Sequence, residues 1–221
     1  HVRSRRQRQM CIRDSLGRVY LVAAGKAAWQ MAHAARACLQ DNFCGGVVVT
    51  KYGHVKGEIA DVACFEGGHP VPDENSLRGT DAALALTEDL TESDTVVFLL
   101  SGGGSGLFEK PLLPLAELQD VTNQLLAAGA DIVEINTIRK RLSAVKGGRF
   151  ARHCAPAQVF AVVLSDILGD PLDMIASGPA YPDSSSCAQA LDIAKRYGLR
   201  LSEWALSLIH ISEPTRLRCI S

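Results

Sequence analysis

A cluster of glycines flanked by hydroxyl side chains lies between an apolar run and a segment that begins near Leu107, and it reads Ser101-Gly102-Gly103-Gly104-Ser105-Gly106. Because glycine has no Cβ, the backbone N–H groups of such a loop can approach an anion closely, and a following helix N-terminus adds partial positive charge. The cluster therefore predicts a cradle for phosphate groups. Glycine-rich turns also occur where a strand only needs tight packing into a helix, so other residues have to decide between these interpretations.

Lys26 follows the apolar run and glycine at 18–25, where a helix is expected to begin. A cation at a helix N-terminus is disfavoured by about 0.3–1 kcal/mol unless an anion is present, because the helix dipole is positive there. Lys26 is therefore a candidate functional residue, the alternative being a solvated side chain. It is no Walker lysine, since Tyr20 and Ala27 replace the glycine and the hydroxyl of that motif. Leu107 likewise replaces the third glycine of G-x-G-x-x-G.

A stiff loop at 67–76 carries a candidate substrate contact. It contains two glycines, two prolines that bracket one residue, and His69. Rigid loops position side chains, so His69 is either a ligand contact or a structural residue. Asp73 or Asn75 is expected to cap the helix that follows.

The segment Asn136–Arg149 concentrates five cations and a glycine pair. In an acidic protein such a cluster favours an anion site, and Arg139 and Lys146 are the two candidates for substrate contact. The alternative for about half of the cluster is a solvated basic helix face.

Two carboxylates follow the apolar run 158–164, at Asp166 and Asp170. One or two carboxylates beside phosphate oxygens and water are the ligands that Mg²⁺ prefers. The sequence therefore predicts that Asp166 and Asp170 hold this metal. The small, hydroxyl-bearing segment 175–179 is expected to lie nearby.

Apolar runs alternate with helical patterns along the chain, which predicts an α/β fold. Strands are expected at 18–24, 46–51, 62–65, 95–100 and 158–164, and helices near 26–39, 75–90, 114–128, part of 132–152, and 184–197. Runs that are apolar throughout are typical of parallel strands buried on both faces. We therefore expect a mostly parallel sheet with helices on both faces.

Both ends of the chain carry sequence that we expect not to belong to the protein. Met10–Ser15 and Leu206–His210 can be encoded by one short DNA element read from opposite strands, and both resemble a transposase adapter used in library preparation. Residues 1–15 and 206–221 are therefore expected to lie outside the fold, which leaves one domain at 16–205, truncated on its C-terminal side. The alternative for the N-terminal segment is a basic arm that binds nucleic acid.

The region 16–205 is acidic, with 16 Lys and Arg against 22 Asp and Glu. This balance supports neither a nucleic-acid nor a membrane surface, and no apolar stretch reaches the ~20 residues of a membrane-spanning helix. Its cysteines form no C-x-x-C pair. The expected location is cytoplasmic, the expected partner is a small-molecule substrate, and a homodimer is left open.

Taken together, these segments resemble the N-terminal domain of the MOFRL-type glycerate 2-kinases, a family also labelled hydroxypyruvate reductase. The resemblance runs, in the family's order, through Ala24–Ala28, Gly68–Asp73, Leu100–Ser105, Asn136–Lys140 and Leu164–Pro179. It implies a Rossmann-like domain and ATP-dependent phosphorylation of D-glycerate at its 2-hydroxyl. It also implies that the family's essential lysine is Lys26 and that a second catalytic cation, an arginine, lies in a C-terminal domain that is absent here.

The resulting hypothesis is that Lys26 contacts the transferred phosphoryl group or the glycerate carboxylate while the loop 101–106 holds the phosphates of ATP. It requires Lys26 and Gly103 to line one pocket. A chain with one wall of the cleft is expected to be crippled in phosphoryl transfer, which depends on positioning and charge neutralisation. The alternatives are an NAD(P)H-dependent hydroxypyruvate reductase, disfavoured because no dinucleotide fingerprint is present, and a non-catalytic sugar-acid binding domain.

Overall fold

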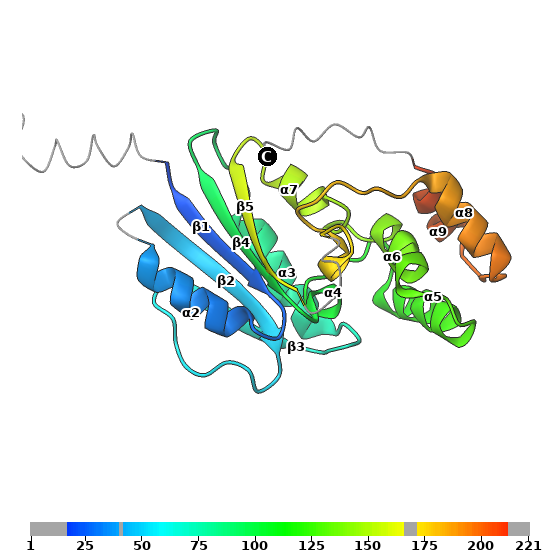
Figure 1. Cartoon of the computed structure of the whole chain (residues 1–221), viewed down its shortest axis with the longest axis horizontal. Coiled ribbons are helices and arrows are strands. Elements are labelled where there is room, and N and C mark those ends of the chain that lie inside the picture. Colours follow the sequence, from blue (N-terminus) through cyan, green and yellow to red (C-terminus); the bar gives the residue numbers. More distant parts are fainter. Residues whose placement is uncertain (1–16, 40–41, 166–171, 212–221) are drawn as a thin grey trace, which may run out of the picture.

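The computed structural model describes residues 17–39, 42–165 and 172–211 and contains a five-stranded sheet flanked by helices (Figure 1). Neighbouring strands all pair in parallel, in the order β3-β2-β1-β4-β5. This confirms the expected α/β architecture. The strands are β1 Val19–Ala24, β2 Phe43–Lys51, β3 Val62–Gly67, β4 Thr95–Ser101 and β5 Gln158–Leu164.

Two helices cover opposite faces of the sheet. Helix α2 (Ala28–Cys38) packs on β1 and β2, whereas α3 (Glu74–Leu86) packs on the other face of β2 and β3. Asp73 caps α3 as expected, because its side chain accepts a hydrogen bond from the backbone of Ser76. The helices after β4 are α4 Gly104–Leu107, α5 Leu115–Ala127, α6 Ile132–Arg141, α7 Arg149–His153, the 3₁₀ turn η1 Ile175–Ser177, α8 Cys187–Arg196 and α9 Glu203–His210. None of the helices that the structure describes has the length and apolarity to span a bilayer.

The face of the sheet that carries α3 also packs against an aromatic cluster. Phe98 of β4, Phe108 after α4 and Phe150 of α7 are fully buried, and their ring centroids lie 4.7 to 5.4 Å apart. Such aromatic groups contribute both buried area and favourable ring geometry. The cluster joins the end of the glycine loop to the sheet.

Helices α5, α6, α8 and α9 form a second core beside the sheet (Figure 1). It is built from apolar residues spaced along each helix, such as Leu118, Ile138 and Ile193. The boundary expected at residue 205 falls inside α9, where Ala205 and Ile209 are fully buried in this core.

Strands β1 and β4 are neighbours at the topological switch point of the sheet. The chain leaves β1 towards β2 on one side and leaves β4 towards β5 on the other. The loops that follow these two strands therefore diverge, and open α/β sheets bind ligands in the crevice that results. Lys26 lies in the first of these loops and Gly102 and Gly103 in the second, and α4 begins at Gly104.

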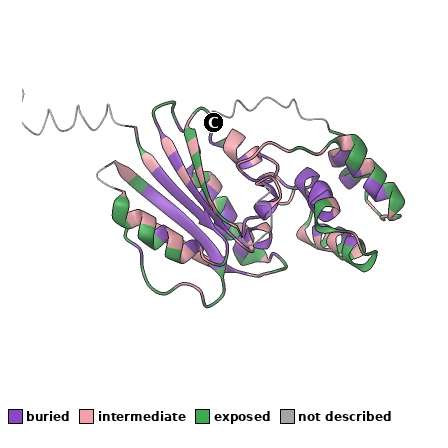
Figure 2. Ribbon diagram, in the orientation of Figure 1, coloured by how far each residue is buried: buried purple, intermediate pink, exposed green. Residues whose placement is uncertain are grey.

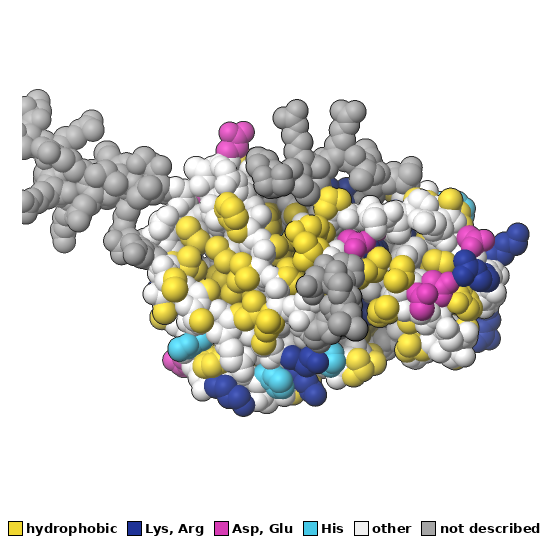
Figure 3. Space-filling model, in the orientation of Figure 1, with side chains coloured by type: hydrophobic (Ala, Val, Ile, Leu, Met, Phe, Trp, Pro, Cys, Tyr) yellow, Lys and Arg dark blue, Asp and Glu magenta, His cyan; other side chains and the backbone are white. Residues whose placement is uncertain are grey.

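The expected burial of β5 on both faces is wrong. Val159, Ala161 and Val163 pack against the core that contains α3, but Phe160, Val162 and Leu164 are 57%, 53% and 55% exposed. Figure 2 shows β5 alternating between exposed and partly buried residues, and Figure 3 shows apolar side chains over this part of the sheet. The physical reason is that α2 packs on β1, β2 and β4 and does not cover β5, which is the edge strand of the sheet.

Candidate functional site

The structure brings Lys26 and the glycine loop together. The backbone N–H of Lys26 donates a 2.9 Å hydrogen bond to the Gly102 carbonyl, and the N–H of Ala27 donates to Ser101 Oγ at 3.0 Å. Thr50, at the end of β2, donates from its hydroxyl to the Gly25 carbonyl at 2.9 Å. These bonds tie the ends of three adjacent parallel strands into one rigid corner.

Two glycines are required for this close approach. Gly25 has φ +122°, and a Cβ there would lie 2.3 Å from Ser101 Oγ. Gly103 has φ +88°, and a Cβ there would lie 2.8 Å from His69 Nε2 and 3.3 Å from Lys26 Cγ. An L side chain at either position would be strained in its backbone and would displace its neighbours. Lys26 and His69 therefore lie beside Gly103, which is the proximity that the sequence hypothesis needs.

The loop 67–76 also lies against the glycine loop. A Cβ on Gly106 would lie 2.6 Å from the Pro70 carbonyl oxygen, so the two loops touch backbone to backbone. Ser76 is buried at the start of α3 and exchanges hydrogen bonds with Asp73. This capped helix start holds His69 beside Gly103.

Lys26 is exposed, and among the described residues no carboxylate lies within ion-pair distance of its ammonium group. Its carbonyl is held by His54 Nδ1 at 2.8 Å, so its backbone is fixed while its side chain is free to meet a ligand. Figure 3 shows Lys, Arg and His side chains gathered at the lower edge of the molecule, where the strands of the sheet end. This edge attracts anions by its charge.

Arg139 and Lys146 do not lie in the open part of the site, where substrate contact was expected. Lys146 is fully buried, and its Nζ donates to the carbonyls of Ser105, Phe108 and Ala176 at 3.0, 3.1 and 3.2 Å. Arg139 is also buried, and its Nη2 donates to the Ser105 carbonyl at 2.8 Å. Both cations therefore contact the glycine loop from the protein interior.

A buried carboxylate compensates part of this charge. Glu109 is fully buried, and its Oε2 lies 3.1 Å from Arg139 Nη2 and 3.6 Å from Lys146 Nζ. Burial lowers the pKa of the Lys146 ammonium to about 8, although Glu109 acts in the opposite direction. The cluster therefore contains two basic groups and one acidic group directly beneath the loop.

The other cations of the basic segment also make contacts inside the protein, so the alternative of a solvated helix face does not describe them. Lys140 is buried between Asp173 and Asp183, and Arg141 pairs with Asp183 at 3.3 Å. Arg149 donates to the carbonyls of Lys140 and Ser143 at the end of α6. Tertiary packing thus buries the charges that the sequence alone presents as a surface cluster.

The carboxylates expected to hold Mg²⁺, Asp166 and Asp170, lie outside the described residues. Within the described part of the chain, no three His, Cys, Asp or Glu side chains are grouped as a metal site would need. The segment 175–179 does lie nearby as expected, since a Cβ on Gly104 would lie 2.7 Å from Ala176 Cβ. Ala176 and Ser177 adopt left-handed backbone at φ +53° and +61°, which is a strained conformation for residues with a side chain.

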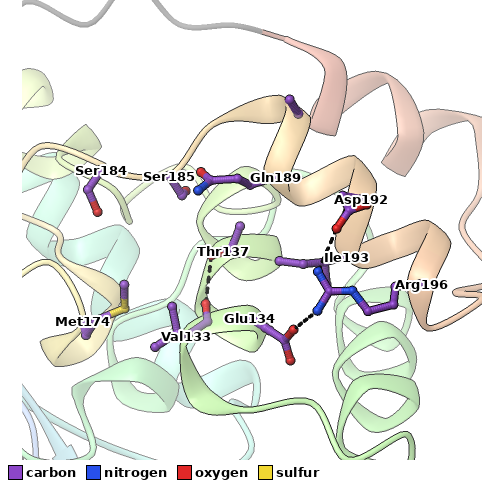
Figure 4. Close-up of a pocket in the computed structure, with 11 residues that line it drawn as sticks. Val133, Glu134, Thr137, Met174, Ser184, Ser185, Gln189, Asp192, Ile193 and Arg196 are labelled. Carbon is purple, nitrogen blue, oxygen red and sulfur yellow. Dashed lines mark hydrogen bonds and ion pairs between the residues drawn. The ribbon is translucent and has the colours of Figure 1, made fainter.

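A groove of about 490 Å³ lies between α6 and α8 (Figure 4). Glu134, Asp192 and Arg196 line it, and Arg196 donates hydrogen bonds to both carboxylates, as the dashed lines in Figure 4 show. None of the residues expected to act in chemistry lines this groove. Lys26, His69 and the glycine loop lie instead at the carboxyl ends of the strands, where the segments after β1, β3 and β4 meet.

Sequence reasoning missed Thr50, His54 and Glu109. Thr50 had a recognisable signal, because it is a polar residue at the end of an apolar strand run. Glu109 had a weak one, a single carboxylate after Leu107 and Phe108. Its partnership with cations 30 and 37 positions further along the chain is a property of the folded state only.

The fold and the position of the loops define a Rossmann-like α/β domain whose candidate site lies at the switch point of a parallel sheet. The chain belongs to the family described as a domain of unknown function, DUF4147, whose sequence profile matches residues 1–210.

The proteins whose sequences are similar to this chain carry two kinds of name. A D-glycerate 2-kinase from Thermotoga maritima is 58% identical over 191 residues, which cover 86% of this chain and 46% of the relative. A putative hydroxypyruvate reductase from Agrobacterium vitis is 42% identical over 195 residues, which cover 87% and 44%. The crystal structure of a glycerate kinase from Thermotoga maritima matches with a TM-score of 0.88 and 54% identity over 95% of this chain and 51% of that one. The chain thus spans about half the length of these proteins, and the expected resemblance is confirmed.

Proposed function

We propose that this chain is the nucleotide-binding part of an ATP-dependent D-glycerate 2-kinase. The observation that carries the proposal is Lys26, an exposed cation without a carboxylate partner in the described structure, fixed beside the glycines of Gly102–Gly104. The names of the relatives and the matched kinase structure supply the reaction class. The expected product is 2-phosphoglycerate.

In this proposal the backbone of the loop 101–106 contacts the phosphate oxygens of ATP. Lys26 neutralises charge on the γ-phosphoryl group as it moves, or holds the glycerate carboxylate, and His69 contacts the substrate. Helix α2 begins at Ala28, two residues after Lys26, and its N-cap residue Ala27 makes no side-chain cap, so the helix N-terminus adds positive potential close to Lys26. Phosphoryl transfer depends on such positioning and charge stabilisation more than on covalent chemistry by the protein.

The reaction forms a bond between the glycerate 2-hydroxyl oxygen and the γ-phosphorus and breaks the bond from that phosphorus to ADP. The hydroxyl proton is released. Mg²⁺ would neutralise phosphate charge, and Asp166 and Asp170 stay its proposed ligands on sequence grounds.

An ADP-release assay on the complete gene product tests the proposal. Lys26→Ala should lower kcat with D-glycerate by about 10³-fold or more, the scale of a lost phosphoryl-stabilising cation. Lys51→Ala is the matched control, because Lys51 is an exposed lysine at the end of the neighbouring strand β2. Unchanged turnover of Lys26→Ala would remove Lys26 from the mechanism.

A second candidate activity is NAD(P)H-dependent reduction of hydroxypyruvate, because relatives from Agrobacterium vitis carry that name. An NAD(P)H absorbance assay on the same preparation separates it from the kinase. Hydride transfer without ADP release would replace the kinase proposal. Calorimetry that detects glycerate binding without nucleotide binding would instead support a non-catalytic sugar-acid binding domain.

A further inference from the structure

The cluster beneath the glycine loop gathers charge in a place that water does not reach. Lys146 and Glu109 have fully buried side chains, and Arg139 is nearly so. Buried ion pairs contribute little net stability, because removing charges from water offsets most of their attraction. The Nε of Arg139 is buried without a hydrogen-bond partner in the described structure, which adds to the cost. Stability alone therefore gives a poor account of this cluster.

Its contacts are concentrated on one short piece of backbone. The Ser105 carbonyl accepts hydrogen bonds from both Arg139 and Lys146. Lys146 also binds the Phe108 carbonyl, which follows α4, and the Ala176 carbonyl of η1. One ammonium group thus joins the glycine loop to the strained turn that packs against Gly104.

We propose that Lys146 and Arg139, with Glu109, are positioning residues that fix the glycine loop in the conformation that receives the nucleotide phosphates. The two cations hold the Ser105 carbonyl towards the protein interior, so that this carbonyl does not face the ligand. Charge-assisted hydrogen bonds are strong enough to impose one orientation on a loop of small residues. The excess of basic over acidic groups also favours an anion on the other side of the loop. The identity of the ligand in this inference rests on the proposed function, whereas the role of Lys146 and Arg139 in holding the loop does not.

Lys140 provides a matched control for Lys146. It is also a fully buried lysine in the same basic segment, but its ammonium binds Asp173 and Asp183 and no atom of the glycine loop. Lys146→Met and Lys140→Met therefore make the same chemical change at the same degree of burial. Both variants are expected to lose stability, and only the first removes the bonds to Ser105, Phe108 and Ala176.

The experiment measures ADP binding by calorimetry and the KM values for ATP and D-glycerate, all on the complete gene product. Lys146→Met should weaken ADP binding about tenfold, the scale of one lost charge-assisted hydrogen bond, and should raise the KM for ATP in proportion. The KM for D-glycerate should change less than about twofold. Lys140→Met should bind ADP within about twofold of the unmodified protein. Equal ADP affinities in the two variants, whether unchanged or equally weakened relative to the unmodified protein, would overturn the proposal.

Amide hydrogen exchange separates failure of this inference from failure of the proposed function. Lys146→Met should speed exchange at the amides of 102–108 in the absence of any ligand, whereas Lys140→Met should not. If the unmodified protein binds no nucleotide, the function is wrong, and this exchange result still decides the positioning role. Unchanged exchange at 102–108 in Lys146→Met would refute it.

Discussion

Gly103→Ala probes the site without removing any charge. Gly103 has φ +88°, and placing alanine in left-handed backbone costs about 1–2 kcal/mol. The new Cβ would lie 2.8 Å from His69 Nε2 and 3.3 Å from Lys26 Cγ. Both contacts involve side chains that can move aside. The loss of folding stability should therefore stay near the backbone value, whereas the two side chains proposed to contact the ligand are displaced.

Gly129→Ala is the matched control. Gly129 has φ +76° between α5 and α6, and a Cβ there would meet no atom within 4 Å. Its backbone cost should be the same 1–2 kcal/mol, with no steric contact. The two variants should therefore unfold at similar urea concentrations and differ only in what they bind.

The assay combines urea unfolding with ADP titration of the complete gene product. Gly103→Ala should bind ADP about tenfold more weakly, which corresponds to about 1.4 kcal/mol, because Lys26 and His69 leave their positions. Gly129→Ala should bind ADP like the unmodified protein. Equal ADP affinity in the two variants would show that the glycine at 103 serves the fold alone, and the phosphate cradle would lose its physical basis.

Three further outcomes follow from the packing. Burial lowers the pKa of Lys146 to about 8, from 10.5 in the unfolded chain, so the unfolded state binds more protons than the folded state between these values. The unfolding free energy of the unmodified protein minus that of Lys146→Met should therefore rise by about 2 kcal/mol from pH 8 to pH 10. Urea unfolding that shows no rise would contradict the burial argument. Phe150→Ala should lower the unfolding free energy by about 3–5 kcal/mol, because the Phe150 ring packs against both Phe98 and Phe108. A loss below about 1 kcal/mol in thermal or urea unfolding would mean that the cluster is loosely packed. Val162→Thr should reduce light scattering on concentration and change the unfolding free energy by less than about 0.5 kcal/mol, because this side chain is exposed on β5. The control is Val48→Thr, which changes a buried side chain and should lower the unfolding free energy more. Equal effects of the two changes on stability would refute the assignment of the open face.

The local features of the site were predictable because they depend on residues near one another in the chain. An apolar run followed by Gly25 and Lys26 predicts a strand, a turn and a helix from spacing alone. The same holds for β4 and the glycines after it. The parallel order of the strands then places both corners at the same edge of the sheet, so that their proximity follows from the fold class.

The sequence alone therefore determined the strands of this protein and the glycine turns after β1 and β4, because each depends on a short-range pattern. Only the tertiary structure decided which of the other cations are buried. Arg139 and Lys146 carry the same charge as Lys26, but Glu109 and the carbonyls of Ser105 and Phe108 meet them inside the protein and take them out of solvent. The open face of β5 was hidden for the same reason, since an apolar run does not reveal whether a helix will cover it. Burial is set by partners distant in the sequence, and no local pattern encodes them.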